Sequence, residues 1–141
     1  MPLDYAKLAC EAMMNRCAAR GLPPEGALVY IQGVFLSGMQ RVWHSEDPFL
    51  AGTMAAGMVK GILFQHIAPS VKHFALNNKE TNRKNSDSRV SERAAREIYL
   101  KVFEIIVKTA KPWYIMSSYN IINGHRASEN RELLEDILRG E

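Results

Sequence analysis

The sequence predicts an α/β fold in which parallel strands alternate with helices. Short apolar runs at residues 27–31, 67–72 and 113–117 have the length of buried strands, and a segment with helical signals follows each one. Strands separated by helices of this length pair in parallel through right-handed crossovers. Three strands do not close a barrel, which takes about 250 residues. The 141 residues therefore form either a small three-stranded layer or a part of something larger.

Helix signals support this alternation. Residues 3–20 have apolar side chains near helical spacing, and glycine and proline residues follow them. A second helix is expected from Asp47-Pro48 to about residue 64, because aspartate caps a helix and proline suits its first turn. Its alanines and glycines are expected to let it pack closely against a sheet.

Serine residues mark the start of two further helices. Ser91 is expected to cap the third helix, and Glu92 suits the positive end of its dipole. Ser128 is expected to cap a last helix that ends near Gly140. The polar segment 77–90 is interpreted as a long loop.

The segment that follows the second apolar run carries the strongest functional signal. Lys72 and His73 end that run, and Arg83 follows ten residues later. In parallel α/β folds, ligands bind at the carboxyl ends of the strands. Side chains rich in hydrogen-bond donors suit a polyhydroxylated or anionic ligand. Other interpretations are a surface lysine, a hydrogen-bonded core histidine and a loop arginine.

Composition limits the class of partner. The net charge is +3, and residues 79–96 carry six basic and three acidic side chains. Because the acids are interspersed and no aromatic residue lies among them, a nucleic-acid partner is not expected. No apolar run reaches the roughly 18 residues of a membrane span, so no membrane partner is expected.

The two cysteines suggest a reduced environment. Cys10 and Cys17 would lie about 10 Å apart along one helix, which is too far for a disulfide. No second Cys or His lies at metal-ligand spacing beside them, so neither a metal site nor a cofactor is expected. We expect a cytoplasmic location.

Five sequence blocks in register resemble the N-terminal barrel domain of glycoside hydrolase family 3, the β-glucosidase type. They lie at residues 45–52, 72–83, 90–100, 116–120 and 128–141. The match is strong over residues 45–141 and poor over residues 1–44. The resemblance implies one partial domain, residues 1–141, which is a partial (β/α)8 barrel of about three β/α units.

The resemblance also implies roles for four residues. Lys72 and His73 match a pair that hydrogen-bonds the hydroxyls of the sugar in the cleavage subsite. Arg83 matches an arginine of the same subsite, and Tyr119 matches a tyrosine beside the nucleophilic carboxylate; a half-buried packing residue is the other interpretation of Tyr119. Met39 stands where the family has a substrate-binding arginine, and whether Arg41 replaces it stays open. The implied partner is an oligosaccharide or β-glucoside.

The implied parent activity is hydrolysis of terminal β-linked glucose or a similar sugar with retention, which needs two carboxylates. In the family the nucleophile follows a motif that here ends at Glu141, and the acid/base comes from a second domain. No catalytic residue is assigned to this chain, and it is expected to be inactive alone. The carboxylates near the implied site are interpreted as helix-cap, ion-pair or surface groups: Glu80, Asp87, Glu92 and Glu129.

Two other functions stay open. The first is a non-catalytic carbohydrate-binding or degenerate remnant that self-associates, because a slice of a barrel leaves strand edges unpaired. A homo-oligomer, or a requirement for the rest of the barrel, is therefore expected. The second is a basic nucleic-acid-binding module, which would show a steep dependence of binding on salt.

Overall fold

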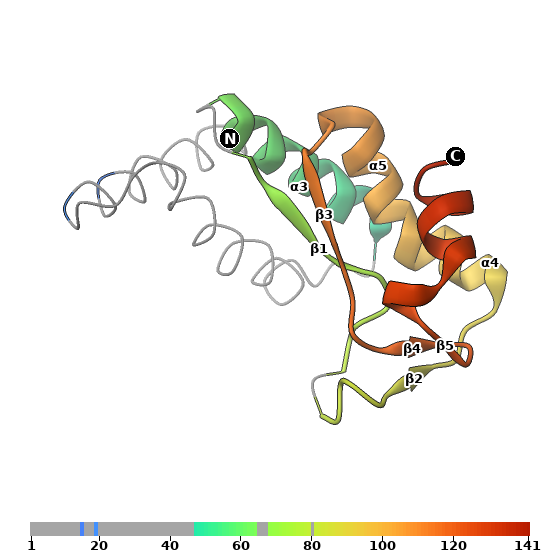
Figure 1. Cartoon of the computed structure of the whole chain (residues 1–141). Coiled ribbons are helices and arrows are strands. Elements are labelled where there is room, and N and C mark those ends of the chain that lie inside the picture. Colours follow the sequence, from blue (N-terminus) through green and yellow to red (C-terminus); the bar gives the residue numbers. More distant parts are fainter. Residues whose placement is uncertain (1–14, 16–18, 20–46, 65–67, 80) are drawn as a thin grey trace.

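A parallel pair of strands forms the centre of the described structure. The computed structural model describes residues 15, 19, 47–64, 68–79 and 81–141. Strand β1 (Ser70–Phe74) pairs in parallel with β3 (Tyr114–Ser117), in register from Ser70 opposite Tyr114. Helices α3 (Pro48–Phe64) and α5 (Lys101–Ala110) pack against each other on one face of this pair (Figure 1). The parallel α/β prediction is confirmed for these two strands.

Several predictions fall on other parts of the chain. Apart from residues 15 and 19, the helix predicted at 3–20 lies outside the described residues, as do the strand at 27–31, both cysteines, Met39 and Arg41. They stay predictions.

Helix α3 (Pro48–Phe64) begins where the sequence predicts. The Asp47 Oδ1 accepts hydrogen bonds from the backbone N–H groups of Phe49 (2.8 Å) and Leu50 (3.3 Å), as an N-cap should. The close approach predicted from its small residues is made at Gly52, but the neighbour there is Ile105 of helix α5 and not the sheet. A Cβ atom on Gly52 would lie 2.9 Å from the Ile105 Cβ.

A long helical segment connects the two strands. Ser91 caps it as predicted, with its Oγ accepting from the Ala94 N–H at 3.2 Å. Lys111 ends it in the left-handed region (φ 50°), where its N–H donates to the Val107 carbonyl at 3.1 Å. The segment consists of α4 (Glu92–Ala94), the π-helical turn η1 (Ala95–Leu100) and α5 (Lys101–Ala110).

A small second sheet corrects the prediction of a long loop. Part of the segment 77–90 forms β2 (Asp87–Ser88), which pairs in parallel with β4 (Ile121–Ile122). A two-residue turn then connects β4 to antiparallel β5 (His125–Arg126). Asn123 (φ 48°) and Gly124 (φ 89°) form this turn, and both have the positive φ that a tight hairpin requires.

The last helix begins later than predicted. Ser128 lies within a short 3-10 turn, η2 (Ala127–Glu129), and the cap is Asn130, whose Oδ1 accepts from the Leu133 N–H at 3.1 Å. The Ser128 prediction is therefore wrong. A π-helical turn, η3 (Glu132–Ile137), follows.

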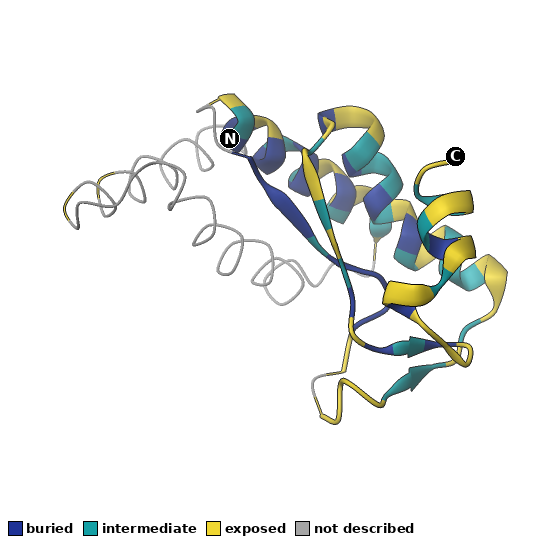
Figure 2. Ribbon diagram, in the orientation of Figure 1, coloured by how far each residue is buried: buried dark blue, intermediate teal, exposed yellow. Residues whose placement is uncertain are grey.

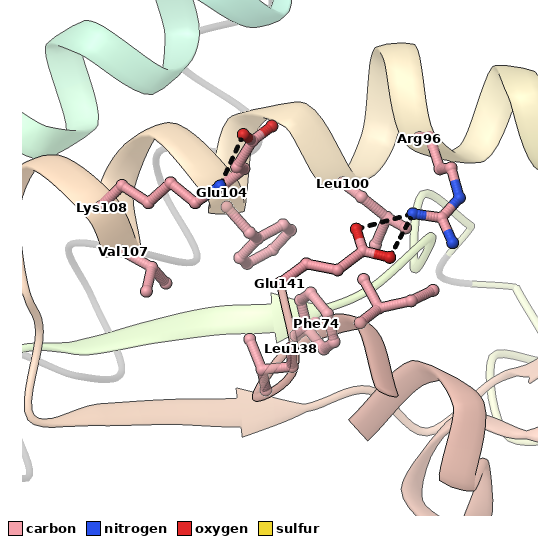
Figure 3. Close-up of a pocket in the computed structure, with 10 residues that line it drawn as sticks. Phe74, Arg96, Leu100, Glu104, Val107, Lys108, Leu138 and Glu141 are labelled. Carbon is pink, nitrogen blue, oxygen red and sulfur yellow. Dashed lines mark hydrogen bonds and ion pairs between the residues drawn. The ribbon is translucent and has the colours of Figure 1, made fainter. Parts of the chain in front are cut away.

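The C-terminus folds back towards the long helical segment (Figure 1). The Arg96 Nη1 donates to both carboxylate oxygens of Glu141, at 2.9 and 2.8 Å. Between α5 and the last helix lies a hollow of about 130 Å³ with mostly apolar walls (Figure 3). Its lining includes Phe74, Leu100 and Leu138.

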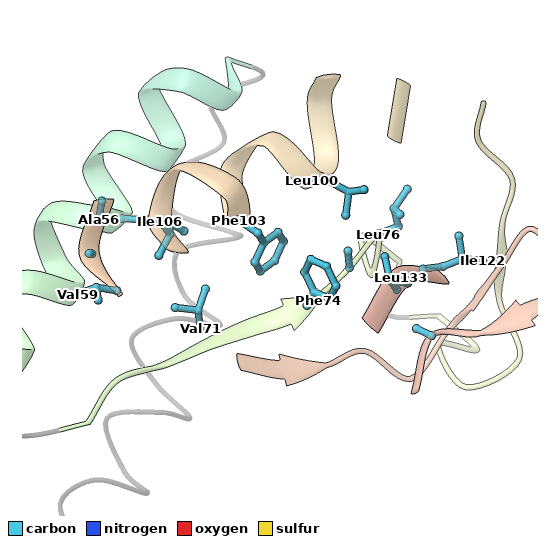
Figure 4. Close-up of a cluster of buried hydrophobic side chains, with 14 residues drawn as sticks. Ala56, Val59, Val71, Phe74, Leu76, Leu100, Phe103, Ile106, Ile122 and Leu133 are labelled. Carbon is cyan, nitrogen blue, oxygen red and sulfur yellow. The ribbon is translucent and has the colours of Figure 1, made fainter. Parts of the chain in front are cut away.

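One hydrophobic core lies between the helices and β1 (Figure 4). Its centre is an edge-to-face pair of Phe74 and Phe103, with ring centroids 4.9 Å apart. Burying a phenylalanine contributes about 1.5–3 kcal/mol, so this pair anchors the carboxyl end of β1 to α5. Strand β1 is buried on both faces, whereas β3 alternates between exposed and half-buried residues (Figure 2).

Within the described part of the chain, no helix combines the length and the apolar character that crossing a membrane requires.

Candidate sugar-binding site

The site is built at the carboxyl end of the β1–β3 pair. The pairing register shifts by one residue there, because Lys72 lies opposite Met116 whereas Phe74 lies opposite Ser117. His73 is the extra residue and is 92% buried, since its exposed fraction is 8%. Bulges of this kind redirect side chains next to functional sites. The peptide bonds Lys72–His73 and Phe74–Ala75 are cis.

Tyr119 joins His73 to Arg83. The Tyr119 and His73 ring centroids are 5.5 Å apart, with the planes inclined at 49°. The Arg83 guanidinium carbon lies 5.2 Å from the Tyr119 ring centroid, within the range of a cation–π contact. Three of the four predicted site residues are therefore neighbours, although they come from three different segments.

Lys72 is the fourth predicted residue. It is half-buried in β1, immediately before His73, and lies opposite Met116 in the strand pairing. The ring contacts therefore link His73, Arg83 and Tyr119, and Lys72 is adjacent to them through the chain.

A buried polar network supports the loop that leaves β1. Ser118 and Asn120, on either side of Tyr119, are only 2% and 1% exposed. The Ser118 Oγ donates to the Ala75 carbonyl at 2.9 Å, and the Asn120 Nδ2 donates to the Leu76 carbonyl at 3.2 Å. Leu76 itself has φ 57°, which is rare for a residue with a branched side chain.

Ser118 and Asn120 lie in the block 116–120 that follows the third predicted strand, and the sequence assigned no role to either residue. The available signal was the alternation of Ser118, Tyr119 and Asn120, in which the two small polar residues face inwards and the aromatic residue faces outwards. A second missed signal was the Asn123-Gly124 pair, the most characteristic dipeptide of a two-residue hairpin.

Two carboxylates near the site, Asp87 and Glu92, have structural partners. Asp87 accepts from the Gly124 N–H at 3.1 Å and from the Arg89 Nε at 2.7 Å, and Glu92 pairs with Arg96 at 3.0 Å. These contacts agree with the cap and ion-pair interpretation of both residues. Glu80 lies outside the described residues, and Glu129 belongs to the 3-10 turn η2.

Charged groups also surround the hollow in Figure 3, but they pair with each other. Hydrogen bonds from Lys101 and then Lys108 hold the pKa of Glu104 below its usual range, so this carboxylate stays ionised and is unsuited to act as a general acid. Hydrogen bonds to Glu141 and Glu92 raise the pKa of Arg96. None of the four predicted site residues lines this hollow.

Among the residues that the structure describes, no three His, Cys, Asp or Glu side chains group in a way that could hold a metal ion.

Known proteins match this chain over the same region. Residues 37–141 match the model of the glycosyl hydrolase family 3 N-terminal domain. The chain is 60% identical over 106 residues to β-glucosidase A of Butyrivibrio fibrisolvens, which covers 75% of this chain and 13% of that protein. It is 52% identical over 132 residues to an exo-α-(1→6)-L-arabinopyranosidase of Bifidobacterium longum, covering 93% of this chain and 17% of that protein.

Solved structures give the same result. The structure resembles β-glucosidase 3B of Thermotoga neapolitana in complex with glucose, with a TM-score of 0.68 and 55% identity over 69% of this chain and 14% of that chain. A β-glucosidase from Kluyveromyces marxianus in complex with glucose gives a TM-score of 0.67 and 52% identity over 69% of this chain and 12% of that chain.

The chain thus spans less than a fifth of the length of these relatives. The matched region includes β1, β3 and all four predicted site residues. The fold is accordingly a part of the family's barrel-like α/β domain, and the chain belongs to glycoside hydrolase family 3.

Proposed function

We propose that this chain is part of a retaining β-glycosidase that hydrolyses terminal β-linked glucose or a similar sugar. In this proposal, Lys72, His73, Arg83 and Tyr119 line part of the pocket that holds the terminal sugar. The observation that carries the proposal is the convergence of His73, Arg83 and Tyr119 at the carboxyl end of the parallel strand pair.

The chemistry of these side chains suits a sugar. Lysine, arginine and histidine donate hydrogen bonds to hydroxyl oxygens, and a tyrosine ring offers a flat face with a hydroxyl at its edge. Tyr119 is 39% exposed, so part of its ring is accessible to a ligand. His73 is buried against it, which fixes the direction in which the imidazole points.

Relatives with related activities support the proposal. Several are β-glucosidases, and two solved relatives are in complex with glucose. The arabinopyranosidase from Bifidobacterium longum is 52% identical over 93% of this chain. An α-L-arabinopyranoside is therefore the second sugar class to test.

The two catalytic carboxylates are proposed to come from outside the site formed by this chain. Asp87 and Glu92 are engaged in ion pairs and backbone contacts, whereas a retaining mechanism requires one carboxylate free to attack and one to transfer a proton. The chain then contributes to sugar binding and not to bond cleavage.

The alternative is a non-catalytic carbohydrate-binding remnant that self-associates. The same engaged carboxylates favour it, because a binding module needs no nucleophile. Both functions require that the sugar binds at the same residues. They differ in whether a longer chain containing this domain cleaves a glycoside.

Titration of the isotope-labelled 141-residue chain with methyl β-D-glucopyranoside, followed by NMR, tests sugar binding. We expect saturable shifts at residues 73, 83 and 119, with a dissociation constant on the order of 10 mM for a partial pocket. Methyl α-L-arabinopyranoside is the comparison ligand. Saturable binding that leaves those residues unshifted, or no binding, would contradict the site.

A further inference from the structure

We propose that Ser118 and Asn120 are positioning residues, which hold the β1 loop and β3 together so that Tyr119 faces His73 and Arg83. The inference rests on the proposed function for its consequence in sugar binding. Its structural core, the placement of one ring against another, can be tested separately.

The loop that leaves β1 is bound by side chains from two other segments of the chain. After Phe74, the Ala75 carbonyl accepts from the Ser118 Oγ at 2.9 Å and the Leu76 carbonyl accepts from the Asn120 Nδ2 at 3.2 Å. A third polar side chain converges on the same place, because the Ser88 Oγ donates to the Leu76 carbonyl at 2.9 Å. Consecutive carbonyls of one loop are thus bound by consecutive inward-facing residues of the other.

The backbone carbonyls that Ser118 and Asn120 bind belong to buried residues. Ala75 is fully buried and Leu76 is 6% exposed, so water cannot replace lost donors at these carbonyls without cost. Ser118 donates to the Ala75 carbonyl, and Asn120, together with Ser88, donates to the Leu76 carbonyl. Removing either side chain leaves a buried carbonyl with fewer hydrogen-bond donors. This costs free energy, which the loop can reduce by shifting.

The backbone of Leu76 lies in the left-handed region. Its φ of 57° is uncommon for a non-glycine residue and persists only where surrounding contacts determine it. The hydrogen bonds to the Leu76 carbonyl come from Asn120 and Ser88. The polar network therefore holds a conformation that the chain would otherwise leave.

Tyr119 lies between Ser118 and Asn120, the two residues that anchor the β1 loop. Because Ser118 and Asn120 face inwards, the intervening side chain is directed outwards, where it meets His73 at 5.5 Å and Arg83 at 5.2 Å. The anchors and the ring belong to one tripeptide. The geometry of the ring contacts depends on where that tripeptide is held.

The test measures the ring contact directly. The imidazole protons of His73, assigned with His73→Gln, report the ring current of Tyr119, and Tyr119→Leu defines their shift when the ring is absent. We expect Ser118→Ala and Asn120→Asp to move these shifts part of the way towards the Tyr119→Leu values. Asn120→Asp keeps the side-chain shape, removes the N–H donors and adds a buried acidic group, so its effect counts only where Ser118→Ala, which adds no charge, moves the shifts in the same direction.

The control separates positioning from general loss of stability. Ile106→Val removes a buried methyl group from α5, 2% exposed, and is expected to lower the melting temperature without moving the His73 shifts. Ser118→Thr keeps the hydroxyl and is expected to restore the wild-type shifts. Equal shifts in Ile106→Val and the two anchor variants, or unchanged shifts in both anchor variants, would overturn the proposal.

Sugar binding is measured on the same samples with methyl β-D-glucopyranoside. We expect the dissociation constant to rise severalfold in Ser118→Ala and Asn120→Asp and to stay unchanged in Ile106→Val. Shifted His73 signals in a chain that binds no sugar would support the positioning role and reject the proposed function. Sugar binding by a chain whose anchor variants leave the His73 signals unshifted would support the proposed function and reject the positioning role.

Discussion

The His73 imidazole and the Tyr119 ring lie with their centroids 5.5 Å apart, although His73 belongs to the end of β1 and Tyr119 follows β3. Parallel pairing of the two strands accounts for this contact, because it brings both carboxyl ends to one edge. Arg83 is the third residue of the cluster, and its guanidinium adds a positive charge close to the Tyr119 ring.

Arg83 is expected to matter for ligand binding and hardly at all for folding. Arg83→Gln removes an exposed charge and a cation–π contact worth about 0.5–1 kcal/mol, so the melting temperature should change little. Binding of methyl β-D-glucopyranoside should weaken about tenfold, as measured by NMR titration. Lys84→Gln, at the neighbouring exposed position, is the control; an equal loss in both variants would mean that only net charge matters.

The 141-residue chain is expected not to hydrolyse p-nitrophenyl β-D-glucopyranoside. Asp87 and Glu92 are occupied in ion pairs and backbone contacts, and loss of catalytic groups lowers rates by about 10⁴-fold or more. The measurement is release of nitrophenol by purified protein. Turnover that disappears on mutation of Asp87 or Glu92 would show that the chain contains a catalytic carboxylate.

Helix α3 should not tolerate a side chain at Gly52. A Cβ atom there would lie 2.9 Å from the Cβ of Ile105, which cannot rotate away. Overpacking costs about 1–3 kcal/mol, whereas replacing glycine by alanine within a helix gains about 1 kcal/mol. Gly52→Ala should therefore lower the free energy of unfolding by up to about 2 kcal/mol in urea denaturation.

Thr53→Ala is the control for Gly52→Ala, because Thr53 is exposed on the same helix and alanine has the higher helix propensity. It should leave stability unchanged or raise it slightly. An increase in stability for Gly52→Ala would mean that α3 and α5 can separate at no cost.

Glu104 should make a small, pH-dependent contribution to stability. Its pKa is lowered in the folded state by Lys101 and Lys108, so the contribution is present above the ordinary glutamate pKa of about 4.3 and is lost as the pH falls through the folded value. Because the pair is exposed, a few tenths of a kcal/mol is expected. The difference in melting temperature between wild type and Glu104→Gln should be largest at neutral pH.

That difference should vanish in acid and shrink in 1 M salt, because salt screens exposed ion pairs. Other carboxylates titrate equally in both proteins and cancel. A difference that persists below the folded pKa would trace to packing of the glutamate stem and not to its charge.

The sequence predicted the strands near 67–72 and 113–117 and two helix caps because their signals are local. Asp47-Pro48 and Ser91 fix helix starts by hydrogen bonds within three residues. The prediction of a cap at Ser128 was wrong because Asn130, two residues later, caps the helix by accepting from the Leu133 N–H. The second sheet was missed because β2 has two residues, and its partner β4 lies more than thirty residues away.

The candidate site divides in the same way. Lys72, His73, Arg83 and Tyr119 came from sequence, the last through family resemblance. The alternation of Ser118, Tyr119 and Asn120 was visible in the sequence, but the anchoring role was not, because the partners are the backbone carbonyls of Ala75 and Leu76.

Self-association remains the prediction with the largest structural consequence. In the described structure β3 pairs with β1 on one side, and its exposed side chains include Tyr114 (55% exposed) and Met116 (40%). An edge strand with exposed apolar side chains is a template for pairing with another chain. We expect the 141-residue protein to form oligomers whose mass in sedimentation equilibrium rises over a tenfold concentration range.

Met116→Lys should reduce this association, because a lysine on an edge strand opposes pairing with a second edge. The matched control is Ile98→Lys, which places the same charge on an exposed apolar position (47% exposed) of the helical turn η1, away from the strands. If β3 is the interface, Met116→Lys shifts the mass towards the monomer and Ile98→Lys does not. Equal effects would assign association to apolar surface in general, and a constant monomer mass in the wild type would reject it.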